Sequence, residues 1–463
     1  MADDTWFVTR SAISSRFLLL FFQALLNEVI DDYDSSSFIQ ESEFQPTWGD
    51  VLFGKVFGGF AKWDAVYFLN IANEGYKYEQ FMAFFPLYPW TLRTLAWMFE
   101  PAAKFLISKR NALLLLGWIS NTVWFTLGAV ALYKLTLRLF ERRKVALVSA
   151  LLFCINPASV FMSSLYTESL FSFLQFTALY YLENEILISA VLLFSLGSAT
   201  RSNGITSCGF VAHCIAKKIL SCASFPQQVS YEFIVGKFFS VVIAFLKMLL
   251  FNGIVVAPFI LFQLYGYKLY CSDTSLAKLA WCNKWLPFPY SHIQSTYWEV
   301  GFLRYFEVKQ IPNFLLASPM IVLCLCAILT YCCDQRNRNS IKTLALLAGK
   351  HKQDDFASRK SIHQSEKRDT DFYHSPSVFV YVVHLAFMTF FGFTSMHVQV
   401  ITRFIASASP LIYWYSAHVI IRETAESSYR NLKRKWKSHL ILGYFLLYFF
   451  IGTALHCNFY PWT

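Results

Sequence analysis

Apolar stretches long enough to cross a lipid bilayer recur along the whole chain, and they constrain its fold more than any other feature. A spanning segment needs about 17 to 25 mostly apolar residues and must satisfy its own backbone hydrogen bonds in lipid, which favours helices. Charged residues make up 15% of the chain, against roughly 25% in soluble domains. The sequence therefore predicts an all-α polytopic membrane protein with about eleven transmembrane helices. The predicted spans are residues 11–30, 111–133, 145–163, 166–183, 186–200, 204–221, 234–265, 312–332, 376–394, 399–421 and 438–456.

The distribution of charge between the loops predicts the orientation of the chain. Residues 31–50 contain six acidic residues and no Lys or Arg, whereas Arg10 and Arg16 precede or open the first span. Cytosolic loops of membrane proteins carry an excess of Lys and Arg, so we expect a cytosolic N-terminus and cytosolic basic loops. The later basic loops are residues 134–144, 217–218, 334–374 and 422–437.

This orientation requires residues 81–100 to lie along the membrane surface. Pro86 and Pro89, close together in FFPLYPW, disfavour a straight span there. The first apolar stretch lacks a small-residue cleavage pattern, so we interpret it as a retained anchor and not as a cleaved signal. The formal net charge of +11 comes from the basic loops, and we expect no nucleic-acid partner.

We expect a single multi-spanning membrane domain over residues 1–463, with luminal loops at 31–110 and 267–311 and a cytosolic basic loop at 334–374. The basic loop is polar and lacks helical periodicity, which is typical of disorder; a cytosolic docking surface is the alternative.

Two cysteines share the loop between residues 267 and 311. Cys271 and Cys282 would form a disulfide if this loop lies in an oxidising lumen. A reduced pair is equally compatible with the sequence, because spacing does not reveal the geometry of the two side chains.

One carboxylate interrupts an aromatic, apolar run on the non-cytosolic side. Asp64 follows Trp63 in AKWDAVYFLNIANEGY, residues 61–76. The surrounding aromatic residues suit a helix at the membrane interface, where a carboxylate with reduced solvation can act as a general base for a hydroxyl nucleophile. The competing interpretation is a helix N-cap. A metal ligand ranks below both, because no cluster with ligand spacing accompanies Asp64, and we expect no metal.

Arg201 ends an apolar span in ATRSNGI, residues 199–205. A cation near the bilayer is costly and indicates function, although an arginine can also extend to the lipid headgroups. Ser202, Asn203 and Gly204 lead into the next span, and backbone amides at that helix start would add to an anion site. We expect the anion to be a phosphate.

A second candidate phosphate contact lies in TSMHVQVITRF, residues 394–404. Gln399 and Arg403 are four residues apart and share a helix face. His397 lies six residues before Arg403, and together they are candidates for a charge-assisted contact with phosphate. A histidine that only packs between helices is the alternative.

Candidate sugar contacts are more dispersed. Glu168 in SLYTESLF, residues 164–171, either begins a helix, where an acid is favourable, or contacts a sugar or ammonium group. The loop 290–314 mixes aromatic and polar side chains, which is typical both of sugar binding and of an interfacial aromatic belt. The remaining candidates for acceptor or sugar binding are Trp63, Asn203, His292, Gln294, Tyr297, Trp298 and Gln399.

Six motifs taken together resemble one family. They run in order from about residue 62 to residue 415: KWDAVYFLNIANEGY, AFFPLYP, INPASVFMSSLYTESLF, ATRSNGI, HIQSTYWEVGFLRYF with QIPNF, and MHVQVITRFIASASPLIYW. As a set they resemble the PIG-V family, the second mannosyltransferases of glycosylphosphatidylinositol (GPI) anchor synthesis. The acidic first loop, residues 222–270 and the basic loop 334–374 lie outside the resemblance.

The resemblance implies a GT-C type glycosyltransferase of the endoplasmic reticulum membrane, with its active site in the lumen and interfacial helices in the first luminal loop. Such an enzyme takes mannose from dolichol-phosphate mannose and adds the second mannose, α1,6-linked, to the mannosyl-glucosaminyl-phosphatidylinositol intermediate. GT-C enzymes usually carry a catalytic acid in the first luminal loop, and Asp64 matches that place. The partners implied are the two lipid substrates and the membrane; an accessory membrane subunit is not visible in the sequence.

The resemblance further suggests an inverting displacement without a cofactor. Asp64 would act as general base, while Arg201, Arg403 and His397 hold the phosphate of the donor. Two alternatives are a dolichol-phosphate-sugar-dependent GT-C transferase with another acceptor and a polytopic lipid or solute transporter. Transporters often contain internal repeats, and no repeated motif occurs in this chain.

Overall fold

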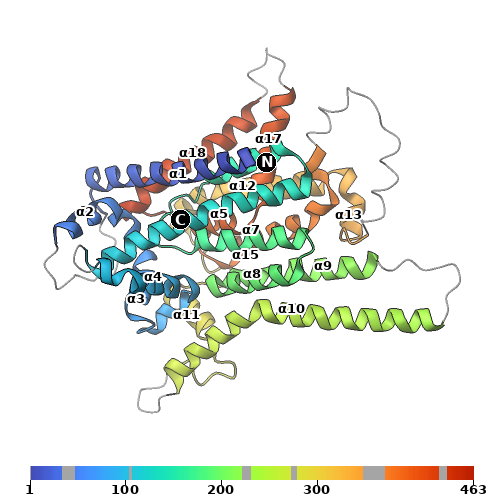
Figure 1. The fold of residues 1–463 in the computed structure, drawn as a ribbon, viewed down its shortest axis with the longest axis horizontal. Coiled ribbons are helices and arrows are strands. Elements are labelled where there is room, and N and C mark those ends of the chain that lie inside the picture. Colours follow the sequence, from blue (N-terminus) through green and yellow to red (C-terminus); the bar gives the residue numbers. More distant parts are fainter. Residues whose placement is uncertain are drawn as a thin grey trace.

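The computed structural model describes residues 2–33, 47–103, 107–221, 231–272, 279–347, 371–426 and 435–462. All regular secondary structure in these ranges is helical (Figure 1). Most of the basic loop expected at residues 334–374 lies outside the described residues, which stop at 347 and resume at 371.

Six of the described helices are long and apolar enough to cross a membrane. They are α1 (Ala2–Val29), α5 (Lys109–Phe140), α10 (Tyr231–Cys271), α12 (Ile311–Cys332), α15 (Phe379–Ser395) and α18 (Trp436–Cys457). A seventh span results if the bent pair α16 (Ile401–Ala408) and α17 (Leu411–Glu426) crosses as one unit; the bend between them is 80°. Pro410 stands at this bend, where its ring and missing N–H interrupt the helix.

Four further predicted spans form shorter helices. These are α6 (Arg143–Cys154), α7 (Glu168–Glu183), α8 (Leu187–Thr200) and α9 (Cys208–Ser221). At 1.5 Å per residue they measure about 18 to 24 Å, less than the hydrocarbon thickness of about 30 Å. The number of about eleven spans therefore stays a prediction.

The connection between α6 and α7, residues 155–167, is irregular and almost entirely buried. Irregular backbone at membrane depth is tolerated where protein surrounds it. Helix α7 lies against α5, α8 and α16. A Cβ at Gly128 of α5 would lie 3.4 Å from the backbone nitrogen of Phe173 of α7, so a small residue allows α5 and α7 to approach closely.

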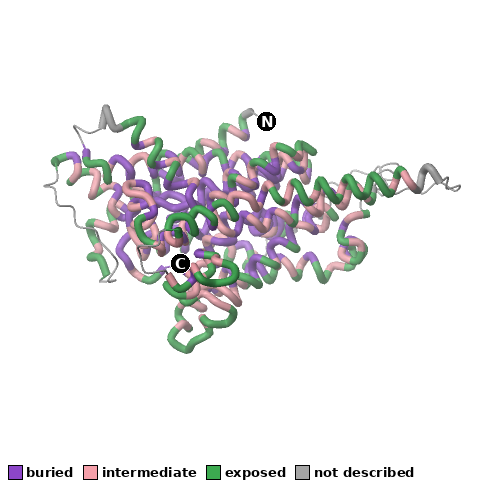
Figure 2. The backbone as a smooth tube through the Cα atoms, turned by 90° about the horizontal axis from the view of Figure 1, so that it is seen from below, coloured by how far each residue is buried: buried purple, intermediate pink, exposed green. Residues whose placement is uncertain are grey.

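The buried core gathers around α5, α6, α7, α16 and α17, and exposed residues dominate the periphery (Figure 2). Helix α1 lies against α5, α6 and α18. Helix α10 runs beside α8 and α9 and then extends beyond them (Figure 1). Only 6% of its most apolar window is buried, as expected for a helix that faces lipid.

The first loop contains three short helices: α2 (Trp48–Phe57), α3 (Ala65–Glu74) and α4 (Leu87–Ala103). Thr47 and Asp50 form a capping box at the start of α2, and Asp50 also accepts a hydrogen bond from the backbone nitrogen of Ser108 at 2.7 Å. Helix α4 is not among the described helices that are long and apolar enough to span; the expectation that residues 81–100 lie along the membrane surface stays a prediction.

The loop after α10 contains a disulfide between Cys271 and Cys282, with Cα atoms 5.6 Å apart. This confirms one of the two alternatives for these cysteines. Helix α11 (Pro289–Tyr297) follows it. The carboxylate of Glu79 accepts hydrogen bonds from Trp281 Nε1 at 3.0 Å and from the Tyr297 hydroxyl at 2.5 Å. These contacts connect the loop to the first loop of the chain.

Candidate active site

A cavity of about 800 Å³ opens between segments that are far apart in the sequence. Its wall combines the start of α3, the turn after α8, helix α11, the segment before α16 and the end of α18. Phe259, Phe387 and Phe391 contribute apolar surface, and Asp64 and Arg403 are among its charged groups. A largely apolar cavity with a few convergent polar groups is the usual form of a ligand site.

Asp64 lies at the centre of the polar wall. Its backbone nitrogen donates a hydrogen bond to the Tyr166 hydroxyl at 3.1 Å, and its Oδ2 accepts one from Arg403 Nη2 at 2.8 Å. Asp64 occupies the N-cap position of α3, as the helix-cap interpretation expects, but its side chain makes no cap hydrogen bond there and pairs with Arg403 instead. The preceding residue, Trp63, has φ of 57°, a left-handed conformation that is costly for a bulky residue and occurs preferentially at functional sites.

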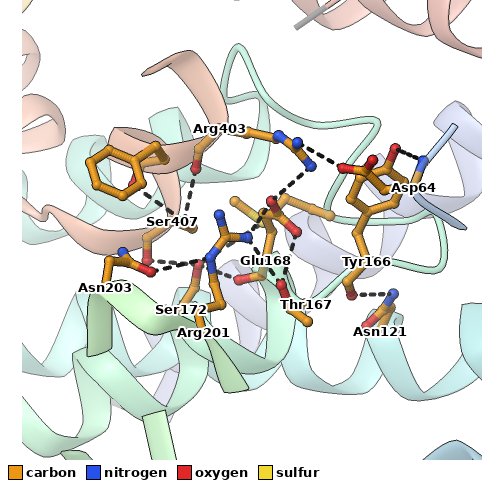
Figure 3. A network of polar contacts seen from close by, with 12 residues as sticks. Asp64, Asn121, Tyr166, Thr167, Glu168, Ser172, Arg201, Asn203, Arg403 and Ser407 are labelled. Carbon is orange, nitrogen blue, oxygen red and sulfur yellow. Dashed lines mark hydrogen bonds and ion pairs between the residues drawn. The ribbon is translucent and has the colours of Figure 1, made fainter. Parts of the chain in front are cut away.

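Glu168, the first residue of α7, joins the two arginines (Figure 3). Its carboxylate forms an ion pair with Arg201 and lies 3.7 Å from Nη1 of Arg403. Glu168 is completely buried, whereas the arginine side chains are 14% and 15% exposed. Arg201 therefore faces inward, and the interpretation as an arginine that extends to lipid headgroups is wrong.

The four charged side chains form a row of alternating sign, in the order Arg201, Glu168, Arg403, Asp64. The two positive formal charges balance the two negative ones. An isolated buried charge costs several kcal/mol, so these side chains are stable away from water only as a group. We call these four residues the charge cluster. It presents two guanidinium groups and one partly exposed carboxylate to the cavity.

Four buried donors of lining residues remain without partners among the described residues: Nε of Arg403, Nδ2 of Asn203, and Nε1 of Trp63 and of Trp462. Asn203 lies in the turn after α8, where its Oδ1 accepts a hydrogen bond from Arg201 Nε at 3.4 Å. A Cβ at the next residue, Gly204, would lie 2.5 Å from the backbone nitrogen of Ser198. Only glycine fits this close approach, which explains the sequence of the turn.

Hydrogen bonds from serine side chains to backbone carbonyls hold together α7 and α16, which carry Glu168 and Arg403. Ser172 of α7 donates a hydrogen bond from Oγ to the carbonyl of Ser407 of α16 at 3.1 Å, and Ser407 Oγ donates to the carbonyl of Arg403 at 2.8 Å. Arg403 also lies over the rings of Phe161 and Tyr166, with its guanidinium carbon 5.1 and 5.3 Å from their centroids. Such cation–π contacts favour the charged guanidinium in a site with little water.

His397 lines the cavity but does not present a positive charge. Burial lowers the pKa of its imidazole, despite the hydrogen bond to the carbonyl of Trp298. That contact is 2.5 Å long and joins Nε2 to a carbonyl oxygen, so Nε2 carries the proton and donates. The ring stacks on Tyr305 with centroids 4.5 Å apart. The lowered pKa favours the neutral imidazole, in which Nδ1 is an acceptor.

The predicted sugar contacts divide into two groups. Those that line the cavity are Trp63, Asn203, Gln294, Trp298 and Gln399. Glu168, His292 and Tyr297 are not among the lining residues; Glu168 is completely buried against Arg201 and Arg403. The Tyr297 hydroxyl donates to Glu79, and this hydrogen bond raises the pKa of Tyr297 to about 12. His292 Nδ1 lies 3.5 Å from Thr296 Oγ1 within its own helix.

Tyr166 and His456 also line the cavity and are not among the site residues predicted from the sequence. Tyr166 accepts the hydrogen bond from the Asp64 backbone. His456, near the end of α18, lies with Nε2 3.2 Å from Ser164 Oγ and with its ring 5.6 Å from that of Tyr166. A histidine inside an apolar span is by itself an indication of function, and this signal was available for His456. Within the described part of the chain, no group of three or more His, Cys, Asp or Glu side chains could hold a metal ion.

Comparisons with known proteins agree with the motifs. Residues 5–463 match the family described as Mannosyltransferase (PIG-V). The chain is 36% identical to the human protein named GPI alpha-1,6-mannosyltransferase 2, over 98% of both chains. It is 31% identical to GPI mannosyltransferase 2 of Schizosaccharomyces pombe, over 89% of this chain and 75% of that protein.

Among solved structures, an oligosaccharyltransferase of Archaeoglobus fulgidus is similar with a TM-score of 0.44 and 11% identity. The match covers 97% of this chain and 56% of that protein. The family match over almost the entire length, together with relatives above 30% identity, shows that the chain belongs to the PIG-V mannosyltransferase family.

Proposed function

We propose that this protein transfers the second mannose, in α1,6 linkage, from dolichol-phosphate mannose to the mannosyl-glucosaminyl-phosphatidylinositol intermediate of GPI-anchor synthesis. Membership of the PIG-V family and the names of the relatives support the reaction. The structural observation that carries the proposal is the charge cluster, which places one partly exposed carboxylate beside two arginines in a cavity among apolar helices.

Asp64 acts as the general base in this proposal. Only Oδ2 contacts Arg403, and Oδ1 has no hydrogen-bond partner among the residues that the structure describes. With 28% of its side chain exposed, Asp64 can take the proton of an acceptor hydroxyl as that oxygen bonds to the anomeric carbon. The bond from the anomeric carbon to the phosphate oxygen breaks at the same time, and its electron pair leaves with dolichyl phosphate. One such displacement inverts a β-linked donor into an α-linked product.

The arginines stabilise the leaving phosphate. During the reaction Asp64 gains a proton and loses its negative charge, while the phosphate gains one negative charge. Arg403, which pairs with Asp64, is then available to pair with the phosphate, and the total charge of the site stays constant. Arg201 is the second cationic contact. Charge stabilisation by groups already in place is usually the largest contribution to catalysis of this kind.

In this proposal His397 serves as a neutral hydrogen-bond acceptor for a sugar hydroxyl. Its proximity to the cavity supports a role in binding, and its neutral state argues against a charge-assisted contact with phosphate. Proton transfer and charge stabilisation both come from side chains of the chain, so the proposed mechanism uses no metal and no cofactor.

We place the cavity in the lumen of the endoplasmic reticulum and the N-terminus in the cytosol. The disulfide between Cys271 and Cys282 supports an oxidising compartment for the loop that carries α11, and α11 supplies part of the cavity wall. The acidic first loop and the basic later loops support the same orientation.

The proposal is tested in cells that lack the second GPI mannosyltransferase, by expressing wild type, Asp64→Asn and Glu74→Gln at matched levels. Glu74 is the last residue of α3, the helix that begins directly after Asp64. It pairs with Lys77 and does not line the cavity, so Glu74→Gln is the control. We expect wild type and Glu74→Gln to restore GPI-anchored surface protein, and Asp64→Asn to accumulate the lipid with one mannose.

The possible failures are distinguishable. A fully active Asp64→Asn variant contradicts the assignment of the base and leaves the reaction in place. Wild type that does not restore surface protein contradicts the assigned acceptor.

A further inference from the structure

Arg16 lies in the protein interior, although its position in the sequence suggested a charge at the membrane surface. We expected Arg10 and Arg16 to mark the cytosolic end of the first span. Helix α1 instead begins at Ala2, so Arg16 lies about 21 Å along it at 1.5 Å per residue. Arg10 is exposed, whereas Arg16 is completely buried. The interpretation of Arg16 as an orienting surface charge is therefore wrong.

The guanidinium of Arg16 is fully hydrogen-bonded. Nη1 donates to the carbonyl of Ser159 at 2.8 Å and to Ser163 Oγ at 3.1 Å. Nη2 donates to the carbonyl of Cys154 and to Ser159 Oγ, both at 3.2 Å. Nε donates to Ser15 Oγ at 3.3 Å. These contacts use all five N–H groups of an arginine.

No carboxylate forms an ion pair with Arg16 among the described residues, and its guanidinium carbon lies 3.9 Å above the ring of Phe125. Cys154 is the last residue of α6, and the carbonyl end of a helix carries partial negative charge. The positive charge is thus balanced by backbone carbonyls, hydroxyl groups and an aromatic face. No donor is left over for a ligand, which excludes a binding site at Arg16.

Three of the five acceptors, the carbonyl and Oγ of Ser159 and Oγ of Ser163, belong to the irregular connection that carries part of the active site. Ser159 and Ser163 lie within residues 155–167, and this connection continues into Tyr166, Thr167 and Glu168. Tyr166 holds the backbone of Asp64. Thr167 Oγ1 accepts a hydrogen bond from Arg201 Nη1 at 3.0 Å. Arg16 therefore binds the connection a few residues before the point where the connection meets the charge cluster.

A role in folding alone does not explain an arginine at this position. Burying a cation costs several kcal/mol, and apolar residues of similar volume often stabilise a protein as well or better. What a guanidinium adds is a rigid fork of donors, which fixes several acceptors in one geometry. The connection has its own turn hydrogen bonds, such as Ser159 N to the Asn156 carbonyl and Ser163 N to the Val160 carbonyl, but these are local. The fork of Arg16 adds contacts that tie the connection to α1 and to the end of α6.

We propose that Arg16 is a positioning residue for mannosyl transfer, which sets the conformation of residues 155–167 and through it the placement of Tyr166 and Glu168. This proposal rests on the proposed function. Arg16 does not line the cavity, so it acts only through the connection. A displacement of about 1 Å at a reacting centre can cost about 100-fold in rate, so loosening the connection should reduce kcat.

The test compares Arg16→Lys and Arg16→Met with Arg10→Lys, an exposed control on the same helix. Each variant is purified, its folded fraction is measured by size-exclusion chromatography, and kcat and KM are determined per folded molecule. The substrates are dolichol-phosphate mannose and the one-mannose GPI lipid. We expect kcat of both Arg16 variants to fall by about 10- to 100-fold, with KM for the acceptor little changed and Arg10→Lys equal to wild type.

Hydrogen–deuterium exchange supplies a readout that does not depend on activity. We expect faster exchange in residues 155–168 of the Arg16 variants and no change in α10, which packs against α8 and α9. Wild-type kcat per folded molecule, with only the yield reduced, would overturn the proposal in favour of a purely structural role. If both Arg16 variants fail to fold, Ser163→Ala decides, because it removes one acceptor and leaves the cation in place; wild-type kcat in that variant overturns the proposal.

Wild-type protein without mannosyl transfer would contradict the proposed function. The exchange experiment would still report whether Arg16 orders the connection.

Discussion

Replacing Arg403 by lysine is the sharpest test of the charge cluster, because the substitution keeps the charge and changes only its geometry. Arg403 uses two different nitrogens: Nη2 lies 2.8 Å from Asp64, and Nη1 lies 3.7 Å from Glu168. A single ammonium group cannot reproduce both contacts. One charge-assisted hydrogen bond contributes about 1.5 to 3 kcal/mol. At about 1.4 kcal/mol for each factor of ten, its loss corresponds to roughly 10- to 150-fold in kcat/KM.

The assay is mannosyl transfer in membranes that contain equal amounts of wild type, Arg403→Lys and Arg138→Lys. Arg138 is exposed in the last turn of α5. Its variant therefore controls for the general effect of replacing an arginine by a lysine. We expect Arg138→Lys to retain wild-type kcat/KM. If Arg403→Lys stays within about threefold of wild type, the fork geometry of Arg403 does not contribute, and the proposed exchange of its partner from Asp64 to phosphate is wrong.

Three further predictions concern the surroundings of the cluster. Tyr166→Phe removes the acceptor of the Asp64 backbone N–H, which costs about 1 to 3 kcal/mol, so kcat should fall roughly 5- to 150-fold; an unchanged kcat would contradict the role of this contact. Burial alone would raise the pKa of Asp50, but hydrogen bonds from Ser108, Thr47 and Asn111 hold the pKa well below its usual range. Asp50 therefore stabilises the fold above its unfolded pKa and loses this effect as the pH falls toward the folded value; Asp50→Asn should lower the melting temperature at pH 7, and a difference from wild type that persists undiminished at the lowest pH tolerated would refute this sign. Replacing Cys271 and Cys282 by serine opens a short loop whose closure contributes about 3 kcal/mol, so thermal denaturation should occur earlier, and thiol labelling should show no free pair in the wild-type loop.

Local sequence patterns were sufficient for several members of the site. Asp64 was identified because a carboxylate in an aromatic, apolar run is expensive unless it has a function, and Arg201 because a cation near the bilayer is costly. Arg403 was identified because it shares a helix face with Gln399 and follows His397 in the same motif. All three line the cavity. The cost of a charge near lipid is a property of the residue and its neighbours in the chain, so no tertiary information is needed to see it.

Other predicted sugar contacts lie outside the cavity wall, because the sequence does not show which side of a helix faces the cavity. His292 and Tyr297 lie on or next to the same short helix as Gln294 and Trp298, yet only the latter two line the cavity. Their sequence context is equally aromatic and polar, and nothing in it says which side of the helix faces the substrate. His456 is a different case, because a histidine inside an apolar span is a signal in the sequence. What the sequence does not show is that this side chain lies against Ser164 and Tyr166.

The sequence by itself determined that the protein is helical, spans a membrane and belongs to the PIG-V family, because hydrophobic length and ordered motifs are read along the chain. Only the tertiary structure decided how the charges pair. Asp64 and Arg403 are 339 positions apart, and Arg16 and Ser163 are 147 apart. The same residue type, arginine, became a surface charge at position 10, a buried fork at position 16 and a member of the charge cluster at position 403. What distinguishes these three roles is the set of acceptors that the folded helices bring to each side chain, and local sequence does not contain it.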